Sequence, residues 1–151
     1  MNKSNYTTYI LMLGCSAIAM YITMYFHTYQ VDHIFFSWTR MYMTFIGISA
    51  MAIIMFLFMK QMYKNKTKNI AIVLGSILLM GLSTYLVRRQ IPIGDVRYMK
   101  AMIPHHSIAI LTSKRADIKD PKVKELAQEI IRAQEKEIAE MKKYIERLEN
   151  E

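Results

Sequence analysis

Three long apolar stretches fill the first part of the chain. One runs from about residue 7 to 26 without a charge, and two more of 19 uncharged residues lie between Arg40 and Lys60 and between Lys68 and Arg88. About 19 helical residues cover roughly 28 Å, close to the thickness of a hydrocarbon core. Because only a helix satisfies its own backbone in lipid, the pattern predicts three transmembrane helices, at about residues 7–26, 41–59 and 69–87.

Two amphipathic helices are predicted in the remaining part. Asp95 can cap a first helix over about residues 95–114, and Asp120 followed by Pro121 signals a second helix over about residues 121–149. The chain is therefore predicted to be all-α, with a helical hairpin after the three spans. The apolar stripe of the second helix alternates steps of four and three residues: Val123, Ala127, Ile130, Gln134, Glu137, Met141, Tyr144 and Leu148, widened by Leu126, Ile131, Ile138 and Ile145.

Composition separates the same two parts. Residues 1–87 contain six Lys or Arg and one acidic residue, whereas residues 88–151 contain 14 basic and 11 acidic residues. This division excludes a single globular domain, and the lone Cys15, which we expect to be buried in an uncleaved first span, excludes a disulfide framework. The expected domains are a membrane domain, residues 1–90, and an extracytoplasmic hairpin, residues 91–151.

Basic residues around the spans predict the orientation. The loop from Lys60 to Lys68 contains four Lys, whereas the loop between the first two spans contains only Arg40, at its end. Because Lys-rich loops remain in the cytoplasm, we expect a cytoplasmic N-terminus, with Lys3 on that side, and an extracytoplasmic C-terminal part. The two Arg residues after the third span oppose this orientation less strongly. We expect integration in the cytoplasmic membrane of a bacterium, with all four His residues outside.

Met and His residues share one face of the first outer helix. At 100° per residue, Met99, Met102 and His106 fall on the same side, while His105 lies off the centre of this stripe. Thioether and imidazole groups one turn apart suit a soft metal, and Cu(I) prefers sulfur. A kink expected at Pro104 would re-aim His105 toward the same point.

Glu137 and Met141 are the candidates on the second outer helix. Glu137 interrupts an otherwise apolar stripe, where a carboxylate is costly unless it is paired or binds a metal. It is expected to be a ligand or an acceptor for an imidazole N–H. The alternative is that the thioethers fill a core, His106 is simply hydrogen-bonded and Glu137 pairs with a cation of a partner helix. The spacing alone leaves both interpretations open.

Other groups give weaker signals. Met51, Met55 and Met59 form a row along the second span, where packing or lipid contact is a simpler interpretation than a thioether relay for Cu(I). His27 and His33, in the loop after the first span, suggest a second metal site or interfacial hydrogen bonds. No activated nucleophile or acid–base pair predicts an enzyme, and the mixed charges of the second outer helix do not predict nucleic-acid binding.

The run from Tyr98 to Ile145 resembles the family known as domain of unknown function 305. The matching elements are Met99-x-x-Met102-Ile-Pro-His105-His106-x-x-Ala109, Leu126-Ala127-x-x-Ile130 and Gln134-x-x-Glu137-Ile138-x-x-Met141. Members of that family are ferritin-like helical proteins of the cell envelope, and some bind copper through His and Met. The resemblance implies copper ligation by Met99, Met102, His105, His106 and Met141. One departure is Thr112, where many members have Met.

The resulting hypothesis is a membrane-anchored extracytoplasmic protein that binds copper, as Cu(I), for sequestration, tolerance or hand-off to a donor or acceptor protein. The alternative is a structural protein whose hairpin oligomerises or docks a partner, and a third candidate is a transporter subunit that uses the Met row. Besides membrane lipid, the expected partner is a second copy of the chain. A lone hairpin would leave Val123, Ile130, Met141 and Leu148 exposed to water. We therefore expect a homodimer or larger oligomer that forms a four-helix, ferritin-like bundle. Small span residues would allow close packing: Gly47, Ala50, Gly75 and Gly81.

Overall fold

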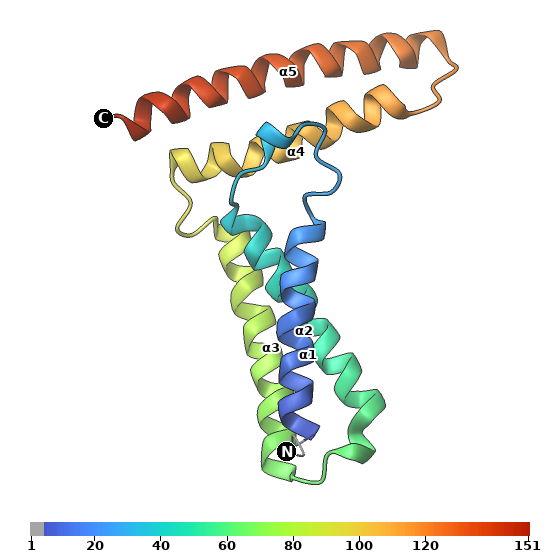
Figure 1. Cartoon of the computed structure of the whole chain (residues 1–151), viewed down its shortest axis with the longest axis vertical. Helices are drawn as coiled ribbons and strands as arrows, with labels where there is room; N and C mark the ends of the chain where they lie inside the picture. The colour runs from blue at the N-terminus through green and yellow to red at the C-terminus, as the bar shows by residue number, and fades with distance from the viewer. Residues whose placement is uncertain (1–4) are drawn as a thin grey trace. The chain divides into compact units, whose positions relative to one another are not determined.

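The structure, a computed structural model, describes residues 5–151, and its regular elements in this range are all helical (Figure 1). The long elements are α1 (Asn5–Thr23), α2 (Trp38–Met59), α3 (Lys66–Arg89), α4 (Asp95–Arg115) and α5 (Pro121–Glu149). Two short 3-10 helices follow α1 and α2, η1 at Val31–His33 and η2 at Lys60–Met62. The five predicted helices are all present, with ends within about three residues of those expected. Lys3, expected on the cytoplasmic side, lies outside the described residues.

The chain forms two compact units. Residues 5–24 and 39–92 make up a three-helix unit of α1, α2 and α3, and residues 25–38 and 93–151 make up a hairpin unit built on α4 and α5. The predicted division at residue 90 separates the two units correctly except for residues 25–38. These residues connect α1 to α2 but pack with the hairpin. We call residues 25–38 the strap.

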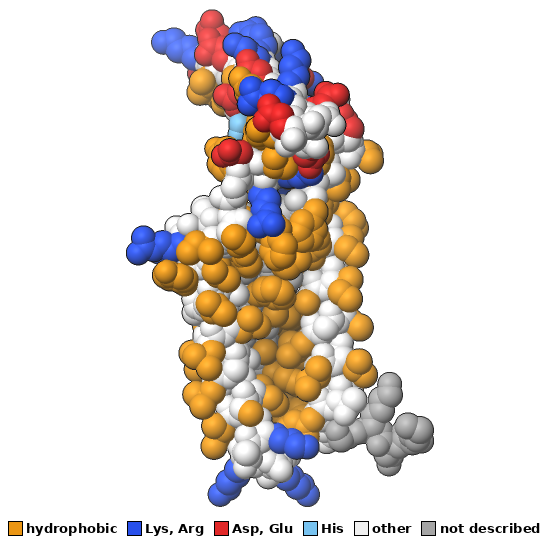
Figure 2. Space-filling model, turned by 90° about the vertical axis from the view of Figure 1, so that its left-hand side faces the viewer, with side chains coloured by type: hydrophobic (Ala, Val, Ile, Leu, Met, Phe, Trp, Pro, Cys, Tyr) orange, Lys and Arg blue, Asp and Glu red, His pale blue; other side chains and the backbone are white. Residues whose placement is uncertain are grey.

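The outer surface of the three-helix unit is apolar. Its three helices are each long and apolar enough to cross a membrane. Large side chains are exposed along them, including Ile18 (63%), Phe58 (87%) and Leu78 (72%), and Figure 2 shows hydrophobic side chains along the length of the unit on one face. Such a surface suits lipid rather than water. Cys15 is exposed on α1, so its expected burial is wrong.

Small polar side chains share the interior of the three-helix unit with a hydrophobic cluster of Tyr9, Ala52 and Tyr63. The buried hydroxyl groups belong to Thr44, Ser49, Ser76 and Ser83, and the first three each donate a hydrogen bond to the carbonyl four residues earlier. These bonds satisfy the hydroxyls within their own helices. Gly47 permits a close approach of α1, because a Cβ there would lie 2.9 Å from Sδ of Met20, whereas Gly75 and Gly81 face open space.

The hairpin unit consists of two antiparallel helices whose register is marked by ion pairs. Asp120 caps α5 by accepting the backbone N–H groups of the second and third residues after it, as its place before Pro121 predicts. α4 is helical from Asp95 to Arg115 through the buried Pro104. The cross-helix pairs are Lys100–Glu149 at 2.5 Å, His106–Glu137 at 3.1 Å and Lys114–Glu135 at 2.8 Å.

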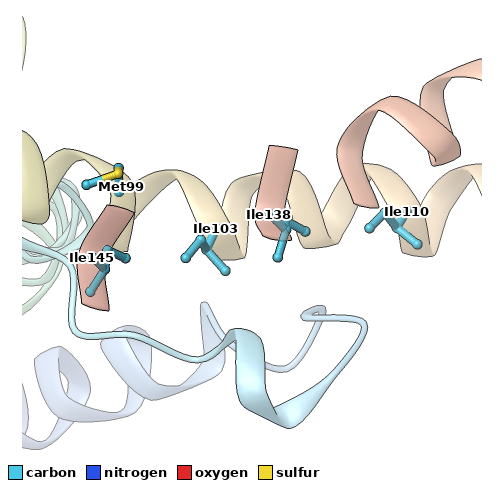
Figure 3. Close-up of a cluster of buried hydrophobic side chains, with 5 residues drawn as sticks. All are labelled: Met99, Ile103, Ile110, Ile138 and Ile145. Carbon is cyan, nitrogen blue, oxygen red and sulfur yellow. The ribbon is translucent and has the colours of Figure 1, made fainter. Parts of the chain in front are cut away.

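The core of the hairpin unit is formed by residues of both helices and covered by the strap. Its buried residues are Met99, Ile103 and Ile110 of α4 and Ile138 and Ile145 of α5. Figure 3 shows the four isoleucines on the side of the helices that faces the strap. Tyr29 and Phe35 of the strap pack against this cluster. The hairpin therefore has a third layer, which the hydrophobic pattern of α4 and α5 alone did not reveal.

The packing face of α5 contains most of the predicted stripe. The predicted residues that are buried or partly buried are Ala127, Ile130, Gln134, Met141 and Leu148, whereas Val123, Glu137 and Tyr144 are exposed, although all three were expected on the packing face. Ile131, Ile138 and Ile145, which the sequence interpretation assigned to the edge of the stripe, are buried or partly buried. The packing face is therefore centred closer to these isoleucines than predicted.

Candidate metal centre on the helical hairpin

His106 of α4 and Glu137 of α5 meet across the hairpin. The His106 side chain is 14% exposed, and its Nδ1 lies 3.1 Å from Oε2 of Glu137. This is a close contact whose angles fall outside those of a hydrogen bond. Burial lowers the pKa of His106, against an opposing effect of Glu137, and His105 lowers it further. The imidazole is therefore neutral at pH 7, which is the form that binds metals.

The three candidate thioethers lie along the same stretch of the hairpin. Met99 is buried in the core, and Met141 is partly buried against the same cluster. Met102 is also partly buried. In the antiparallel register, Met102 and Met141 both fall between the Lys100–Glu149 and His106–Glu137 pairs. The structure thus brings Met102, His106, Glu137 and Met141 into one segment, with Met99 one turn away on α4.

Two expectations about this segment are wrong. His105 is exposed, with its ring centroid 6.1 Å from that of His106, because α4 continues through Pro104 and leaves His105 on the outer face. Glu137 is not buried on a packing face, since half of its side chain is exposed at the edge of the interface. Glu137 does lie beside His106, but without hydrogen-bond geometry, so its role as an acceptor for an imidazole N–H stays a prediction.

The donor set limits the kind of metal that can bind. Between residues 5 and 151, no group of three or more His, Cys, Asp and Glu side chains is arranged to hold a metal ion. A metal bound here would depend on the thioethers of Met99, Met102 and Met141 beside the imidazole of His106. Thioethers and imidazole fit Cu(I), whereas zinc takes thiolate, imidazole and carboxylate ligands.

The strap contacts α4 at the residue that follows His106. His33 is 5% exposed, and its Nδ1 lies 2.9 Å from Oγ of Ser107, which is fully buried. The same Oγ accepts the backbone N–H of Tyr29 at 2.8 Å. Burial is the largest cause that lowers the pKa of His33, followed by Lys142, while Asp32 opposes them. His33 thus has the hydrogen-bonding role considered for it in the sequence, and His27 is exposed.

Charged and aromatic contacts complete the attachment of the strap. Nζ of Lys142 lies 2.5 Å from Oδ2 of Asp32, and Nζ of Lys114 lies 4.6 Å from the centre of the Tyr29 ring. A cavity of about 240 Å³ remains in this region, lined by Tyr29, Gln30, His33, Ile110, Glu135, Ile138, Ala139 and Lys142. Sequence reasoning missed this role of the strap. The length of the strap and its Ile-Phe-Phe run did indicate that it packs on another part of the chain, because a long ordered loop with apolar side chains needs a surface to cover.

Comparisons with known proteins match both units. The profile of the family described as "Domain of unknown function (DUF305)" matches residues 94–151, which contain α4 and α5. "Uncharacterized protein L153" of Acanthamoeba polyphaga mimivirus is 34% identical over 140 residues, covering 91% of this chain and 90% of the relative. That alignment therefore extends beyond the hairpin into the three-helix unit. No solved structure matches the chain.

Proposed function

The chain belongs to the domain of unknown function 305 family, and from its donor set we propose that it is a membrane-anchored, extracytoplasmic copper-binding protein. The observation that carries the proposal is the gathering of Met102, His106 and Met141 in one segment of the hairpin, with Met99 one turn away. Sequestration, tolerance and hand-off of Cu(I) all require such a soft site. No catalytic step is proposed.

Each residue of the candidate centre has a distinct role in this proposal. The thioethers of Met99, Met102 and Met141 supply sulfur, and His106 supplies one nitrogen. Glu137, 3.1 Å from Nδ1 of His106, favours a proton on that nitrogen and so leaves Nε2 as the ligating atom. His105 is exposed, and we assign it a smaller contribution than His106. This assignment differs from the equal weight that the family resemblance gives to the two histidines.

The connection of the chain supports membrane anchoring with the hairpin outside. The strap follows one long apolar helix and the hairpin follows three, so two membrane crossings separate them and they emerge on the same side. Their contacts through Ser107 require that arrangement. The four Lys residues between α2 and α3 favour a cytoplasmic position for that loop. In intact cells, a cysteine at Ser113 should then react with an impermeant reagent and one at Asn65 should not.

Copper analysis of the purified protein tests the proposed function. Wild-type protein loaded with Cu(I) in mild detergent should retain the metal against a competing chelator. The variant Met99→Leu/Met102→Leu and the variant His106→Ala should lose it at lower chelator concentrations, and His105→Ala should have a smaller effect. Met43→Leu/Met62→Leu removes two exposed thioethers outside the hairpin and serves as the matched control. Equal retention by all variants would exclude this site.

The exposed apolar residues of α5 support self-association as a second element of the proposal. Val123, Leu126 and Tyr144 are about half exposed, and they lie outside the face covered by α4 and the strap. A second hairpin placed against them would form a four-helix bundle of the ferritin-like kind. The mass in mild detergent should be that of a dimer or larger, and Leu126→Lys should reduce it. A monomer under these conditions would favour docking of an unrelated protein.

A further inference from the structure

The net charge of the protein is confined to one unit. All 12 acidic residues of the sequence lie in residues 25–38 and 93–151, together with the same number of Lys and Arg. The three-helix unit, residues 5–24 and 39–92, therefore carries seven Lys or Arg residues and no acidic residue, and with Lys3, which lies outside the described residues, these account for the formal charge of +8. The negative charges that neutralise these basic side chains must therefore belong to groups outside the unit.

Four of these charges are concentrated in one loop. Lys60, Lys64, Lys66 and Lys68 lie within nine residues, between the end of α2 and the first turn of α3, and all four are exposed. We call residues 60–68 the lysine loop. Figure 2 shows Lys or Arg side chains at the lower end of the three-helix unit, beyond the apolar band.

The lysine loop is fixed to α1 by hydrogen bonds. The backbone N–H of Asn65 donates to the Tyr6 hydroxyl at 3.0 Å, and that hydroxyl lies 2.9 Å from Oδ1 of Asn69. Nδ2 of Asn69 donates to the carbonyl of Tyr63 at 2.9 Å. The Asn65 side chain accepts from the backbone N–H of Lys68 at 3.0 Å and so caps α3.

Aromatic packing holds the same loop from inside. The buried Tyr63 ring lies 5.0 Å from Tyr6, 5.6 Å from Tyr9 and 6.0 Å from Phe56, measured between ring centroids. A loop that served only as a flexible connection would not need these contacts. The lysines are therefore displayed from a fixed backbone beside an amphipathic aromatic cluster, which is the side-chain combination found at the level of lipid headgroups.

We propose that the lysine loop binds the phosphate groups of anionic phospholipids at the surface of the membrane. The inference rests on the proposed membrane anchoring but not on copper binding. Lysine presents a flexible point charge suited to phosphate, and clusters of four or more basic residues next to a span attract anionic lipid. Since the unit supplies no acidic side chain, lipid phosphate is the counter-charge that lies within reach in a bilayer.

The test measures lipid preference in reconstituted vesicles. Full-length protein is placed in phosphatidylcholine vesicles containing spin-labelled phosphatidylglycerol or spin-labelled phosphatidylcholine, and the protein-associated fraction of each label is compared. The wild type should prefer phosphatidylglycerol by about fivefold or more at low ionic strength, and this preference should fall toward unity in roughly 1 M salt. Lys60→Gln/Lys64→Gln/Lys66→Gln/Lys68→Gln should lose most of it at low salt.

A matched variant separates the position of the charges from their number. Lys122→Gln/Lys124→Gln/Arg132→Gln/Lys143→Gln removes the same charge from exposed sites of α5 and should keep the preference. An unchanged preference in the lysine-loop variant, or an equal loss in both variants, would overturn the proposal. Displacement of the labelled lipid by inorganic phosphate at constant ionic strength would overturn it too, because the ligand would then be the free anion.

Two controls distinguish the possible failures. Circular dichroism checks that the variants remain helical. If the fourfold variant does not fold, Lys64→Gln/Lys66→Gln replaces it, and about half of the loss of phosphatidylglycerol preference is then expected. Carbonate extraction checks the anchoring. Release of the wild type into the soluble fraction would refute the proposed function, whereas an embedded protein without lipid preference would refute this inference alone.

Discussion

The two units of this protein differ in what they bury and what they expose. The hairpin unit buries isoleucines between α4, α5 and the strap, and its surface carries balanced charges. The three-helix unit exposes many large apolar side chains, such as Phe58 and Leu78, and its interior contains serine and threonine beside Ile48 and a small aromatic cluster. Burial of apolar surface stabilises a fold only against water, so the same residue types contribute differently in the two units. The predictions below separate these two kinds of stabilisation.

Truncation of the hairpin core should have the largest effect on stability. Ile103 and Ile138 are 0% and 3% exposed, and replacing either by Ala removes buried methyl groups and leaves a cavity. A loss of about 2–4 kcal/mol in the free energy of unfolding of the hairpin unit is expected. Chemical denaturation in mild detergent, followed by the amide exchange of α4 and α5, measures this loss.

The same truncation on α3 provides the comparison. Leu78 is 72% exposed in the three-helix unit, and Leu78→Ala should change the stability of that unit by less than about 1 kcal/mol in detergent. Equal losses for Leu78→Ala and Ile138→Ala would mean that the outer surface of α3 is covered by protein and not by lipid.

Removal of the Ser107 hydroxyl should release the strap. Ser107→Ala leaves two groups of the strap, the buried Nδ1 of His33 and the partly buried N–H of Tyr29, without this partner. The expected cost is about 1–3 kcal/mol. Hydrogen exchange should accelerate in the strap, while α1 and α2 exchange as in the wild type. Faster exchange in all three regions would indicate that the strap also holds the spans in place.

Acidification should weaken the same attachment more gradually. The pKa of His33 is lowered from 6.5 in the folded protein, mainly by burial. A His with a lowered pKa stabilises the fold fully above its unfolded pKa, and this stability is lost as the pH falls below about 6.5 toward the folded value. Asp32 does not contribute in this pH range, because its hydrogen bond with Lys142 lowers its pKa from the ordinary value of 3.8.

Strap exchange rates, corrected for intrinsic chemistry, should therefore rise between pH 7.5 and 5.5. Over this interval His33 and His106, whose pKa is also lowered by burial, gain protons, whereas Asp32, with its lowered pKa, stays charged. His33→Gln should flatten the profile, and His106→Gln should alter it less in the strap. A profile that stays the same in His33→Gln would show that another group controls the attachment.

The smallest expected effect tests packing inside the three-helix unit. Gly47→Ala would place a Cβ 2.9 Å from Sδ of Met20, which lies at the end of a flexible side chain and can move. The net change should be within about 1 kcal/mol and unfavourable. Gly75→Ala, in open space, should instead stabilise α3 by about 0.5–1 kcal/mol through its helix propensity. Thermal unfolding of both variants and the wild type in the same detergent shows whether each substitution raises or lowers the stability.

The helices could be predicted from sequence because their signals are local. Charges bracket the apolar stretches of α2 and α3, and the Asp120–Pro121 pair marks the start of α5. The proximity of His106 and Glu137 was also accessible, although Glu137 lies at the exposed edge of the interface and not on the packing face from which the expectation was drawn. Short-range patterns thus located the elements and one contact of the candidate centre.

The surface that the strap covers and the exact packing face of α5 could not be predicted, because both depend on a partner distant in sequence. His33 and Ser107 are separated by 74 positions, and nothing near His33 indicates that contact. On α5, apolar residues follow the four-three pattern in two neighbouring registers. The isoleucine register packs against α4 and the strap, and this leaves Glu137 and Tyr144 outside. Tertiary contacts decide between patterns that are equivalent along one helix.

The position of the strap between α1 and α2 has a consequence for biogenesis. The ribosome completes residues 25–38 before it makes α4 and α5. The surface against which Tyr29, His33 and Phe35 pack is therefore the last part of the chain to be synthesised. In the proposed topology, a nascent chain in which either α2 or α3 failed to cross the bilayer would leave the strap and the hairpin on opposite sides. Its hairpin would then display the uncovered isoleucine face, an apolar surface of the kind that quality-control proteases and chaperones recognise. In the proposed topology, formation of the hairpin core would therefore depend on both α2 and α3 crossing the bilayer.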